Sequence, residues 1–416
     1  VNIDGGGDGS SSDDASIHPL PYHAGDIATV MPCNSNDEVN RFLDVLPTRI
    51  KEMADRTISI SSNDGGGVSQ KAWPKQCTLR MWLTYCADIH SLPEREDLRS
   101  LGPFCSPNHP MGKDQMQKLI SLSETSESAL LADYVLREKR NWVEVFYDFD
   151  SLRHEDSKIT IEALLYLLPS MRPRDFSIAS SPRWSVKQMS SSADDEQDDD
   201  GGFDIELCVA VVEGTTPLGR SHHGLCSKYL SQQMPSANGT LRVWIRPGSF
   251  HRLPMELDIE ADSSGQSRYK VPVLCIGAGT GVAPLRSLLQ ERAINQQEVT
   301  VAATSNAQSA NATNDHPDNT LLFGCRRKVA DYYYESEWQS MCQTNGLRLM
   351  TAFSQDQVQK IYVQKVLREA DDGNFILEHL VSNKGAIYIA GGPKMARAVK
   401  DEIVEALTAA SGGDER

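Results

Sequence analysis

The sequence of 416 residues is poor in three features, and each shortage narrows what the protein can be. Its nine cysteines form no C-x-x-C pair and no Cys/His cluster at zinc spacing, which argues against a disulfide framework and a structural metal site. Basic residues number 41 against 57 acidic ones, and the net charge of −16 disfavours nucleic acid or an anionic membrane as the main partner. No apolar run approaches the roughly 18 residues that span a bilayer. We therefore predict a soluble protein of a reducing, cytoplasmic compartment, without a bound metal.

Two segments have few apolar residues. Residues 1–17 are rich in glycine, serine and aspartate, and residues 190–202, SSSADDEQDDDGG, contain a run of acids. Neither segment offers enough apolar surface to offset the entropy lost on ordering. We expect a disordered tail at 1–17 and an inserted polar loop at 190–202. The rest of the chain is long enough for at least two domains.

The first part of the chain predicts one strand and several helices. The apolar run at 27–31 is typical of a strand that ends at Pro32. In segments 38–50, 79–89 and 116–137, apolar residues recur at three- and four-residue spacing, which is the period of a helix.

The middle of the chain has a different pattern. Segments 176–180, 203–213 and 241–248 are short runs rich in β-formers, separated by serine, glycine and proline. Such runs predict an antiparallel sheet or barrel.

After residue 269 the pattern changes again. Four continuous apolar runs, VPVLCIG, TLLFG, LRLMTAF and GAIYIAGG, are each followed by a helical stretch. Alternation of this kind predicts a parallel sheet covered by helices on both faces. The polar segment 293–319 interrupts it, and we interpret this segment as a disordered insertion.

A glycine-rich turn follows the first of these strands. The sequence GAGTG at 277–281 lies between the strand and a helix whose first turn can contain Pro284. Backbone amides of such a turn can approach a phosphate at the helix N-terminus, so the turn predicts a dinucleotide site. A purely structural turn is the alternative, because the Rossmann pattern G-x-G-x-x-G is not matched.

A second candidate motif follows the third strand. In AFSQDQVQKIYVQ, residues 352–364, Ser354 can donate to a phosphate, Lys360 can neutralise one, and Tyr362 offers a ring for stacking. The combination suits a 2′-phosphorylated adenosine. A polar loop leading into a surface helix is the alternative interpretation.

Two motifs in the middle of the chain suit a flat, charged ligand. In RPRDFSIAS, strand alternation puts Arg174 and Phe176 on one face and Ser177 on the other. The serine can hydrogen-bond a ring nitrogen that gains and loses a hydride. In GLCSKYL, a glycine precedes Cys226 and Ser227 at the start of a predicted helix, which gives a second anion-type site.

In this order the four motifs resemble those of the ferredoxin-NADP⁺ reductase superfamily, and specifically the diflavin reductases typified by cytochrome P450 reductase. Within that group the chain is most similar to the NADPH-dependent diflavin oxidoreductases of cytosolic iron–sulfur cluster assembly. The supporting stretches include AGDIATVMPCNSNDEVNRFLDVL, RPRDFSIASSP, LLFGCRRKVADYYYESEW and AFSQDQVQKIYVQ.

The resemblance implies an α/β plus β-barrel fold in which an antiparallel FAD-binding barrel with a helical insertion precedes a parallel-sheet NADPH-binding domain. The barrel would span 18–268, with the insertion at about 36–165, and the NADPH domain would span 269–416. The implied FAD-binding residues are Arg174, Asp175, Phe176, Ser177, Gly224, Leu225, Cys226 and Ser227, with Ser177 also catalytic. The implied NADP-binding residues are Gly279, Thr280, Arg326, Ser354, Gln355, Lys360, Ile361, Tyr362, Val363 and Gln364.

The resemblance also implies an electron path. In the family, hydride passes from NADPH to FAD, and electrons then move through an FMN domain to an anamorsin-type iron–sulfur protein. We expect this chain to be a fragment without the flavodoxin-like FMN domain, the first barrel strand or two, and the terminal aromatic residue that covers the flavin. A P450 or sulfite reductase type of diflavin enzyme is one alternative, and a non-catalytic interaction module that kept the fold is another.

Three positions depart from the family pattern. Gln355 stands where the family usually has arginine, so selectivity for NADPH should rest more on Lys360 and Arg326. Ala390 occupies the place of a cysteine that P450 reductases keep near the nicotinamide, and Ala398 stands where relatives often have aspartate.

Overall fold

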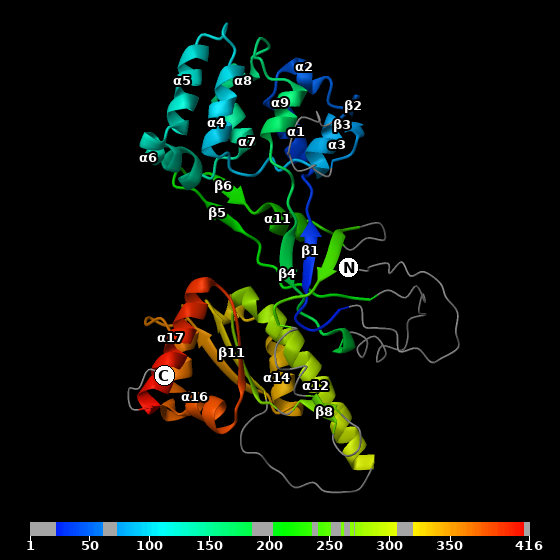
Figure 1. Ribbon diagram of the computed structural model, residues 1–416, viewed down its shortest axis with the longest axis vertical. Coiled ribbons are helices and arrows are strands. Elements are labelled where there is room, and N and C mark those ends of the chain that lie inside the picture. Colours follow the sequence, from blue (N-terminus) through cyan, green and yellow to red (C-terminus); the bar gives the residue numbers. More distant parts are fainter. Residues whose placement is uncertain are drawn as a thin grey trace, which may run out of the picture. The chain divides into compact units, whose positions relative to one another are not determined.

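The computed structural model describes residues 22–60, 73–184, 203–234, 240–250, 259–261, 267–269, 271–305 and 319–411 (Figure 1). The predicted tail at 1–17 and the polar loop at 190–202 lie outside these residues. The chain divides into two compact units. The parallel-sheet unit comprises Val1–Thr29, Asp175–Val209 and Trp244–Arg416, and the helical unit comprises Val30–Arg174 and Ala210–Val243.

The parallel-sheet unit is built on four strands in the order β12-β11-β10-β13. Their bounds are β10, Val273–Ala278; β11, Asn319–Cys325; β12, Arg348–Phe353; and β13, Ala386–Ala390. All neighbouring pairs are parallel, and Cys275 of β10 is in register with both Leu321 and Tyr388. The predicted parallel sheet is therefore confirmed.

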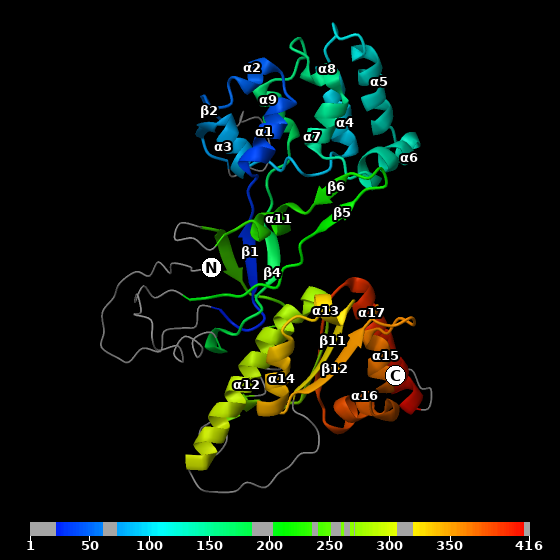
Figure 2. The same cartoon turned by 180° about the vertical axis from the view of Figure 1, so that it is seen from behind.

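Helices cover both faces of this sheet (Figure 2). They are α12, Val282–Ser305; α13, Lys328–Asp331; α14, Glu335–Thr344; α15, Val363–Glu369; α16, Phe375–Leu377; and α17, Pro393–Ala410. On one face Cys275 packs in a cluster with Trp338 of α14, and on the other Ile276 packs in a cluster with Phe375 of α16. Successive side chains of a strand point to opposite faces, so one buried strand supplies both cores.

Helix α12 corrects one prediction. The segment 293–319 was expected to be a disordered insertion, but the helix continues through its first part to Ser305. Ala293 and Ile294 are buried, and the Arg292 guanidinium donates to Asn319 Oδ1 and to the Val271 carbonyl, so packing extends the helix past the predicted boundary. Residues 306–318 lie outside the described ranges. Within those ranges, no helix combines the length and apolarity needed to cross a membrane.

The helical unit contains ten α-helices and two antiparallel strand pairs among its described residues. The helices are α1, Asn36–Asp44; α2, Thr48–Lys51; α3, Leu79–Tyr85; α4, Arg95–Leu101; α5, Gly112–Ser123; α6, Ser128–Leu131; α7, Trp142–Asp148; α8, Asp150–Arg153; α9, Ile161–Leu167; and α11, Leu225–Ser231. The strand pairs are β2, Thr57–Ser59, with β3, Gln76–Thr78; and β5, Glu213–Thr215, with β6, Ser221–His223.

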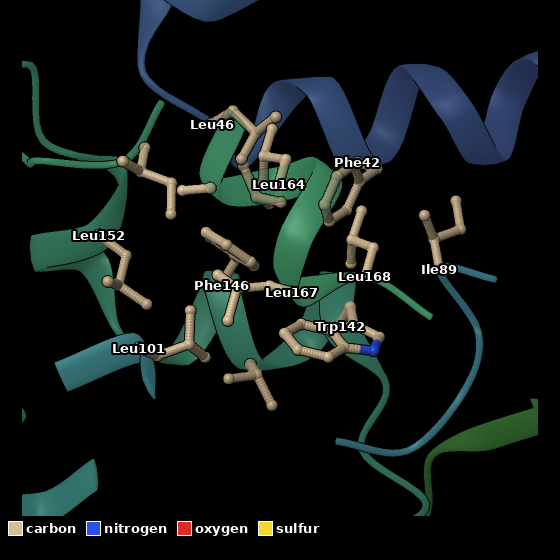
Figure 3. Packing of buried hydrophobic residues seen from close by; sticks show 14 of the residues in the cluster. Phe42, Leu46, Ile89, Leu101, Trp142, Phe146, Leu152, Leu164, Leu167 and Leu168 are labelled. Carbon is tan, nitrogen blue, oxygen red and sulfur yellow. The ribbon is translucent and has the colours of Figure 1, made fainter. Parts of the chain in front are cut away.

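One apolar core holds the helices of this unit together. Phe42 of α1, Phe146 of α7 and Leu164 of α9 converge in it (Figure 3). The rings of Phe42 and Phe146 meet edge to face with centroids 5.7 Å apart, a geometry that aromatic pairs favour.

Local signals set the ends of the helices. Ser35 caps α1 and Asn141 caps α7, each in a capping box with the residue three positions later. The helix predicted at 38–50 divides at Pro47, which has no N–H to donate. The helix predicted at 79–89 ends early, at Tyr85.

The helix predicted at 116–137 is also interrupted. The regular helix α5 begins at Gly112 and ends at Ser123, where Glu124 adopts an extended conformation. Shorter turns follow, and the last of them, Ala132–Arg137, is a π-helix.

A three-stranded sheet in the order β4-β1-β7 contains the remaining long strands. Its strands are β1, Ile27–Met31; β4, Arg174–Ser177; and β7, Arg242–Arg246, close to the strands predicted at 27–31, 176–180 and 241–248. A further antiparallel pair joins β8, Ile259–Ala261, to β9, Ser267–Tyr269. Antiparallel sheets thus precede the parallel one, as the sequence predicts.

The prediction of a strand at 203–213 is wrong. Only isolated bridges form there, one of them between Ile178 and Leu207, and β5 begins at the end of the segment. Side-chain hydroxyls accept hydrogen bonds from two of its backbone amides, Glu206 N to Ser180 Oγ and Val212 N to Ser227 Oγ. Amides used in this way do not donate to a ladder, so the segment stays irregular.

Neighbouring aromatic residues of α7 give a test of the helical core. Phe146 is fully buried, whereas Tyr147 is 64% exposed and only lies against Arg153. We predict that Phe146→Ala lowers the free energy of unfolding by about 3–5 kcal/mol, because it removes an aromatic ring from a packed core. Tyr147→Ala should cost less than about 1 kcal/mol. Urea denaturation followed by far-UV circular dichroism measures both values, and equal losses would contradict the packing described.

Candidate functional site

The loops at the carboxyl ends of the four parallel strands hold most of the predicted nucleotide-binding residues. Thr280 follows β10, Arg326 follows β11, Ser354 follows β12, and Gly391 follows β13. Because the strands are parallel, these ends lie at one edge of the sheet. In open α/β sheets, ligands bind at this edge.

The turn after β10 requires glycine at two positions. Gly279 has φ +55°, a conformation that side chains rarely adopt. A Cβ on Gly281 would lie 2.4 Å from the Ala390 carbonyl oxygen, so only glycine lets this turn pack against the end of β13. The turn, Gly279–Gly281, is a single 3₁₀ turn that leads directly into α12.

A cleft of about 350 Å³ opens beside this turn, within the parallel-sheet unit. Phe176 and Ser177 of β4 line it together with Thr280, so the structure brings these three predicted residues together. Lys360 does not line this cleft and lies in the loop that follows β12. The lining consists of Asp175, Phe176, Ser177, Cys208, Ala278, Thr280, Gly281, Ala283, Pro284, Ala390, Gly391 and Gly392.

Burial keeps the thiol of Cys208, one of the lining residues, in its neutral form. Desolvation raises the pKa of Cys208, and this effect outweighs a hydrogen bond with Tyr334 and the charge of Arg286, which both lower it. The cleft wall is therefore uncharged at this position at neutral pH.

Backbone hydrogen bonds join the loops after β11 and β12. The Ser354 amide donates to the Cys325 carbonyl at 2.9 Å, and the Gln355 amide donates to the Arg326 carbonyl at 2.8 Å. Lys328 N donates to Asp356 Oδ2 at 2.9 Å. These bonds hold the two loops side by side.

The joined loops present several predicted nucleotide-binding side chains to solvent. Arg326, Gln355, Lys360 and Tyr362 are exposed. Val363 differs, because its side chain is buried and packs close to Gly324.

The helical unit contains a second cavity, of about 450 Å³, that is lined by three of the predicted FAD-binding residues. Arg174, Gly224 and Leu225 line it. Its charged and histidine lining residues are Glu38, Arg41, Asp88, His90, Lys139, Glu144, Arg174, His222, His223 and Lys228. The lining thus contains more cationic and histidine side chains than carboxylates, in a protein whose net charge is −16.

Not every residue of the GLCSKYL motif faces this cavity. Helix α11 begins at Leu225, as predicted, but the side chains of Cys226 and Ser227 are buried. Ser227 Oγ donates to the Gly224 carbonyl and accepts from the Val212 amide. Desolvation raises the pKa of Cys226 to about 11, an effect that the charge of Arg174 reduces, so this thiol is neutral at physiological pH. These two side chains fix the turn rather than line the cavity.

Two carboxylates orient the cations of the cavity. Asp88, nearly buried, lies 3.7 Å from the Arg174 guanidinium. Glu38 accepts a 2.7 Å hydrogen bond from Lys228, and its Oε1 lies 3.3 Å from His90 Nε2. Burial alone would raise the pKa of Glu38, but the close contact with His90 and the hydrogen bond from Lys228 outweigh it and hold that pKa well below its usual range.

Sequence reasoning did not single out Glu38. The pattern S-x-x-E at residues 35–38 is a readable capping-box signal, and it correctly marks the start of α1. The same carboxylate also binds Lys228, far away in the sequence, and no local pattern indicates that contact.

Comparison with protein families identifies what this arrangement belongs to. A family model described as FAD binding domain matches residues 13–229, which is half of the chain. The chain belongs to the FAD binding domain family. A second model, described as oxidoreductase NAD-binding domain, matches residues 275–401, which include the glycine turn and all four parallel strands except the first two residues of β10.

Curated relatives agree with this assignment. The chain is 31% identical over 392 residues to NADPH-dependent diflavin oxidoreductase 1 of Mus musculus, which covers 93% of this chain and 54% of that protein. It is 29% identical over 402 residues to the protein of the same name from Emericella nidulans, with coverage of 94% and 54%. It is 27% identical over 392 residues to NADPH–cytochrome P450 reductase of Drosophila melanogaster, with coverage of 94% and 49%. The chain spans about half the length of these relatives.

The predicted resemblance to diflavin reductases is thereby confirmed, and the chain carries an FAD-binding and a nicotinamide-nucleotide-binding domain. The geometry fits both cofactors. The cations of the second cavity, Arg174 among them, fit a diphosphate, and the space beside Gly279, where a Cβ would meet no atom within 4 Å, leaves the backbone of the glycine turn open to a phosphate.

The charge pairs of Glu38 predict a pH dependence of stability. Its pKa is lower in the folded than in the unfolded chain, where it is about 4.3. Its contribution is therefore present above that pH and is lost as the pH falls towards the folded-state value. We predict that Glu38→Gln lowers the free energy of unfolding by about 2 kcal/mol at pH 7, since it weakens hydrogen bonds to a charged group.

Denaturation curves between pH 3 and 7 test this prediction, and the gap between wild type and E38Q should narrow below about pH 4.3. Asp44→Asn is the matched control. It removes the exposed pair with Lys51 and should cost less than about 1 kcal/mol at any pH. A gap for E38Q that stays constant down to pH 3 would contradict the assignment.

Proposed function

We propose that this chain is the FAD- and NADPH-binding part of a diflavin reductase, which takes a hydride from NADPH onto FAD and passes the electrons on singly. The observation that supports it best is the cleft in which Phe176 and Ser177 lie together with Thr280. When bound, the nicotinamide supplies a hydride and the flavin accepts it, so the protein has to orient the two rings and keep water away.

Within the cleft, β4 supplies the groups for the flavin. The Phe176 ring offers an apolar contact, and the Ser177 hydroxyl can donate a hydrogen bond to a ring nitrogen, so Ser177 is the proposed catalytic residue. Asp175, just before them, accepts a 2.7 Å hydrogen bond from Thr29 Oγ1 and pairs with Arg246. These contacts hold the strand that presents the two neighbouring side chains.

In the helical unit, Arg174, Gly224 and Leu225 would bind the diphosphate of FAD. Asp88 holds the guanidinium of Arg174, and the buried side chains of Cys226 and Ser227 fix the turn at Gly224. A planar, forked cation beside backbone amides is a favourable arrangement for a diphosphate.

The edge of the parallel sheet would bind NADPH. Gly279 and Thr280 would contact its diphosphate and nicotinamide end. The exposed residues after β11 and β12, together with the backbone beside them, would bind the 2′-phosphate and adenine. This second set consists of Arg326, Ser354, Gln355, Lys360, Ile361, Tyr362, Val363 and Gln364.

The finer parts of the proposal rest on the family resemblance of the sequence motifs. We propose a closed FAD barrel at 18–268 with a helical insertion at about 36–165, an NADPH domain at 269–416, and work in the cytoplasm. The electron path would lead through an FMN domain to an anamorsin-type iron–sulfur protein. Similarity to Drosophila NADPH–cytochrome P450 reductase supports a second candidate, a cytochrome P450 reductase.

The central experiment uses the purified chain supplied with FAD. The protein should turn yellow, oxidise NADPH and reduce ferricyanide. Electron transfer to an iron–sulfur protein or to a cytochrome P450, measured after an FMN domain is added, separates the two candidates. Absence of both flavin absorbance and NADPH consumption would refute the reductase and leave a non-catalytic module.

Arg174 gives a test of the FAD site. We predict that Arg174→Ala weakens FAD binding roughly 10- to 100-fold, because it removes charge-assisted bonds to a phosphate. Flavin fluorescence released on dilution measures the affinity. Arg172→Ala is the matched control, since Arg172 is exposed just before the same strand and should leave binding unchanged. Equal FAD affinity in R174A and wild type would count against the site.

Lys360 gives a test of the 2′-phosphate contact. We predict that Lys360→Ala raises KM for NADPH roughly tenfold and leaves KM for NADH almost unchanged, because only NADPH carries the phosphate that the ammonium binds. Lys365→Ala, on α15 and paired with Glu369, serves as the control and should change neither value. Steady-state ferricyanide reduction gives both constants. A parallel rise for NADH would show that Lys360 has another role.

A further inference from the structure

We propose that Arg286 of α12 is a positioning residue for hydride transfer, which holds the segment after β4 so that Phe176 and Ser177 keep their place opposite Thr280. The inference rests on the proposed function. Arg286 does not line the cleft. It acts through the segment after β4 and through the start of α12, which both contribute lining residues.

The Arg286 side chain is buried and fully engaged. Its Nη1 donates to the Ala179 carbonyl at 2.9 Å and to Glu206 Oε2 at 2.8 Å. Its Nε donates to Glu337 Oε2 of α14 at 2.8 Å, and the guanidinium lies 4.2 Å from the ring centroid of Tyr334. One planar cation therefore binds a backbone carbonyl, two carboxylates and an aromatic face.

The next turn of α12 extends this contact. Ser287 Oγ donates to the Ser180 carbonyl at 2.8 Å, and Gln290 Oε1 accepts from the Ser181 amide at 2.8 Å. Ser181 Oγ in turn donates to Glu291 at 2.6 Å. Three successive backbone groups after β4, at residues 179, 180 and 181, are thus bound by side chains of one helix.

This contact has a direct consequence for the cleft. Ala179 is only two residues beyond Ser177, and Arg286 is only two residues beyond Pro284, which lines the cleft with Thr280. Glu206 also lies two residues before Cys208, a third part of the lining. Arg286 therefore connects three short segments that each contribute a residue to the cleft. A shift of Arg286 would move Ser177, Pro284 and Cys208 relative to one another.

Lysine cannot replace this arrangement. An ammonium lacks the planar fork that binds Ala179, Glu206 and Glu337 at once, so Arg286→Lys keeps the charge but loses part of the contact. Because displacement of reacting groups by about 1 Å can cost 100-fold in rate, we expect the R286K variant to reduce bound FAD with NADPH roughly 10- to 100-fold more slowly. FAD content and KM for NADPH should stay close to wild type.

Stopped-flow absorbance at saturating NADPH measures the rate of flavin reduction in the FAD-loaded chain. The matched control is Arg368→Lys, which alters an arginine–glutamate pair with Glu402 on the other face of the same sheet. R368K should reduce FAD at the wild-type rate, even if its Tm falls. Glu206→Gln is a second variant that keeps Arg286 and should slow the reaction in the same direction as R286K.

Hydrogen–deuterium exchange of the chain without FAD supplies a readout that is independent of activity. The amides of residues 178–183 should exchange faster in R286K than in wild type or R368K. A wild-type rate of flavin reduction in R286K, or unchanged exchange at these amides, would overturn the positioning role alone. A wild-type chain that binds FAD but consumes no NADPH would instead defeat the proposed function, and this inference with it.

Discussion

In the parallel-sheet unit the buried cation Arg286 joins several separate parts of the chain. Arg286 is held between Glu206 and Glu337, and an arginine placed there without partners would be costly to bury. Its charge is compensated only if α12, α14 and the segment after β4 are all in place. Apolar packing of the sheet against its helices has no preferred direction. The hydrogen bonds of Arg286 add contacts that do require a particular geometry. The Arg286 contacts thus join α12 to the segment after β4 and to α14 beside the two apolar cores of the unit.

In the helical unit, too, single carboxylates take part in more than one contact. Glu38 completes the capping box of α1 and binds Lys228 of α11, while Asp88 lies beside the Arg174 guanidinium. In both units, side chains that complete local structure also fix the groups that would contact a cofactor. A diphosphate requires cations whose directions are set before it binds, and carboxylates that are themselves buried can set them.

Sequence reasoning predicted what local pattern determines. The four parallel strands, β1, β7 and the start of α11 follow from apolar period and glycine position. Sequence reasoning failed where contacts between residues far apart in the sequence determine the local structure. The segment 203–213 has strand composition, but its amides bind serine hydroxyls, and α12 outlasts its predicted end because Arg292 packs against Asn319. Neither the serine hydroxyls nor Asn319 can be identified as partners from the spacing of residues in the sequence.

The meeting of the glycine turn with β13 bears on how the cleft can vary. Gly281 approaches the backbone carbonyl of Ala390, and the side chain at position 390 takes no part in that approach. Position 390 can therefore carry a methyl group or a thiol while the turn keeps its conformation. The backbone contact that shapes the turn and the side chain that position 390 presents to the cleft are therefore separate features of the fold.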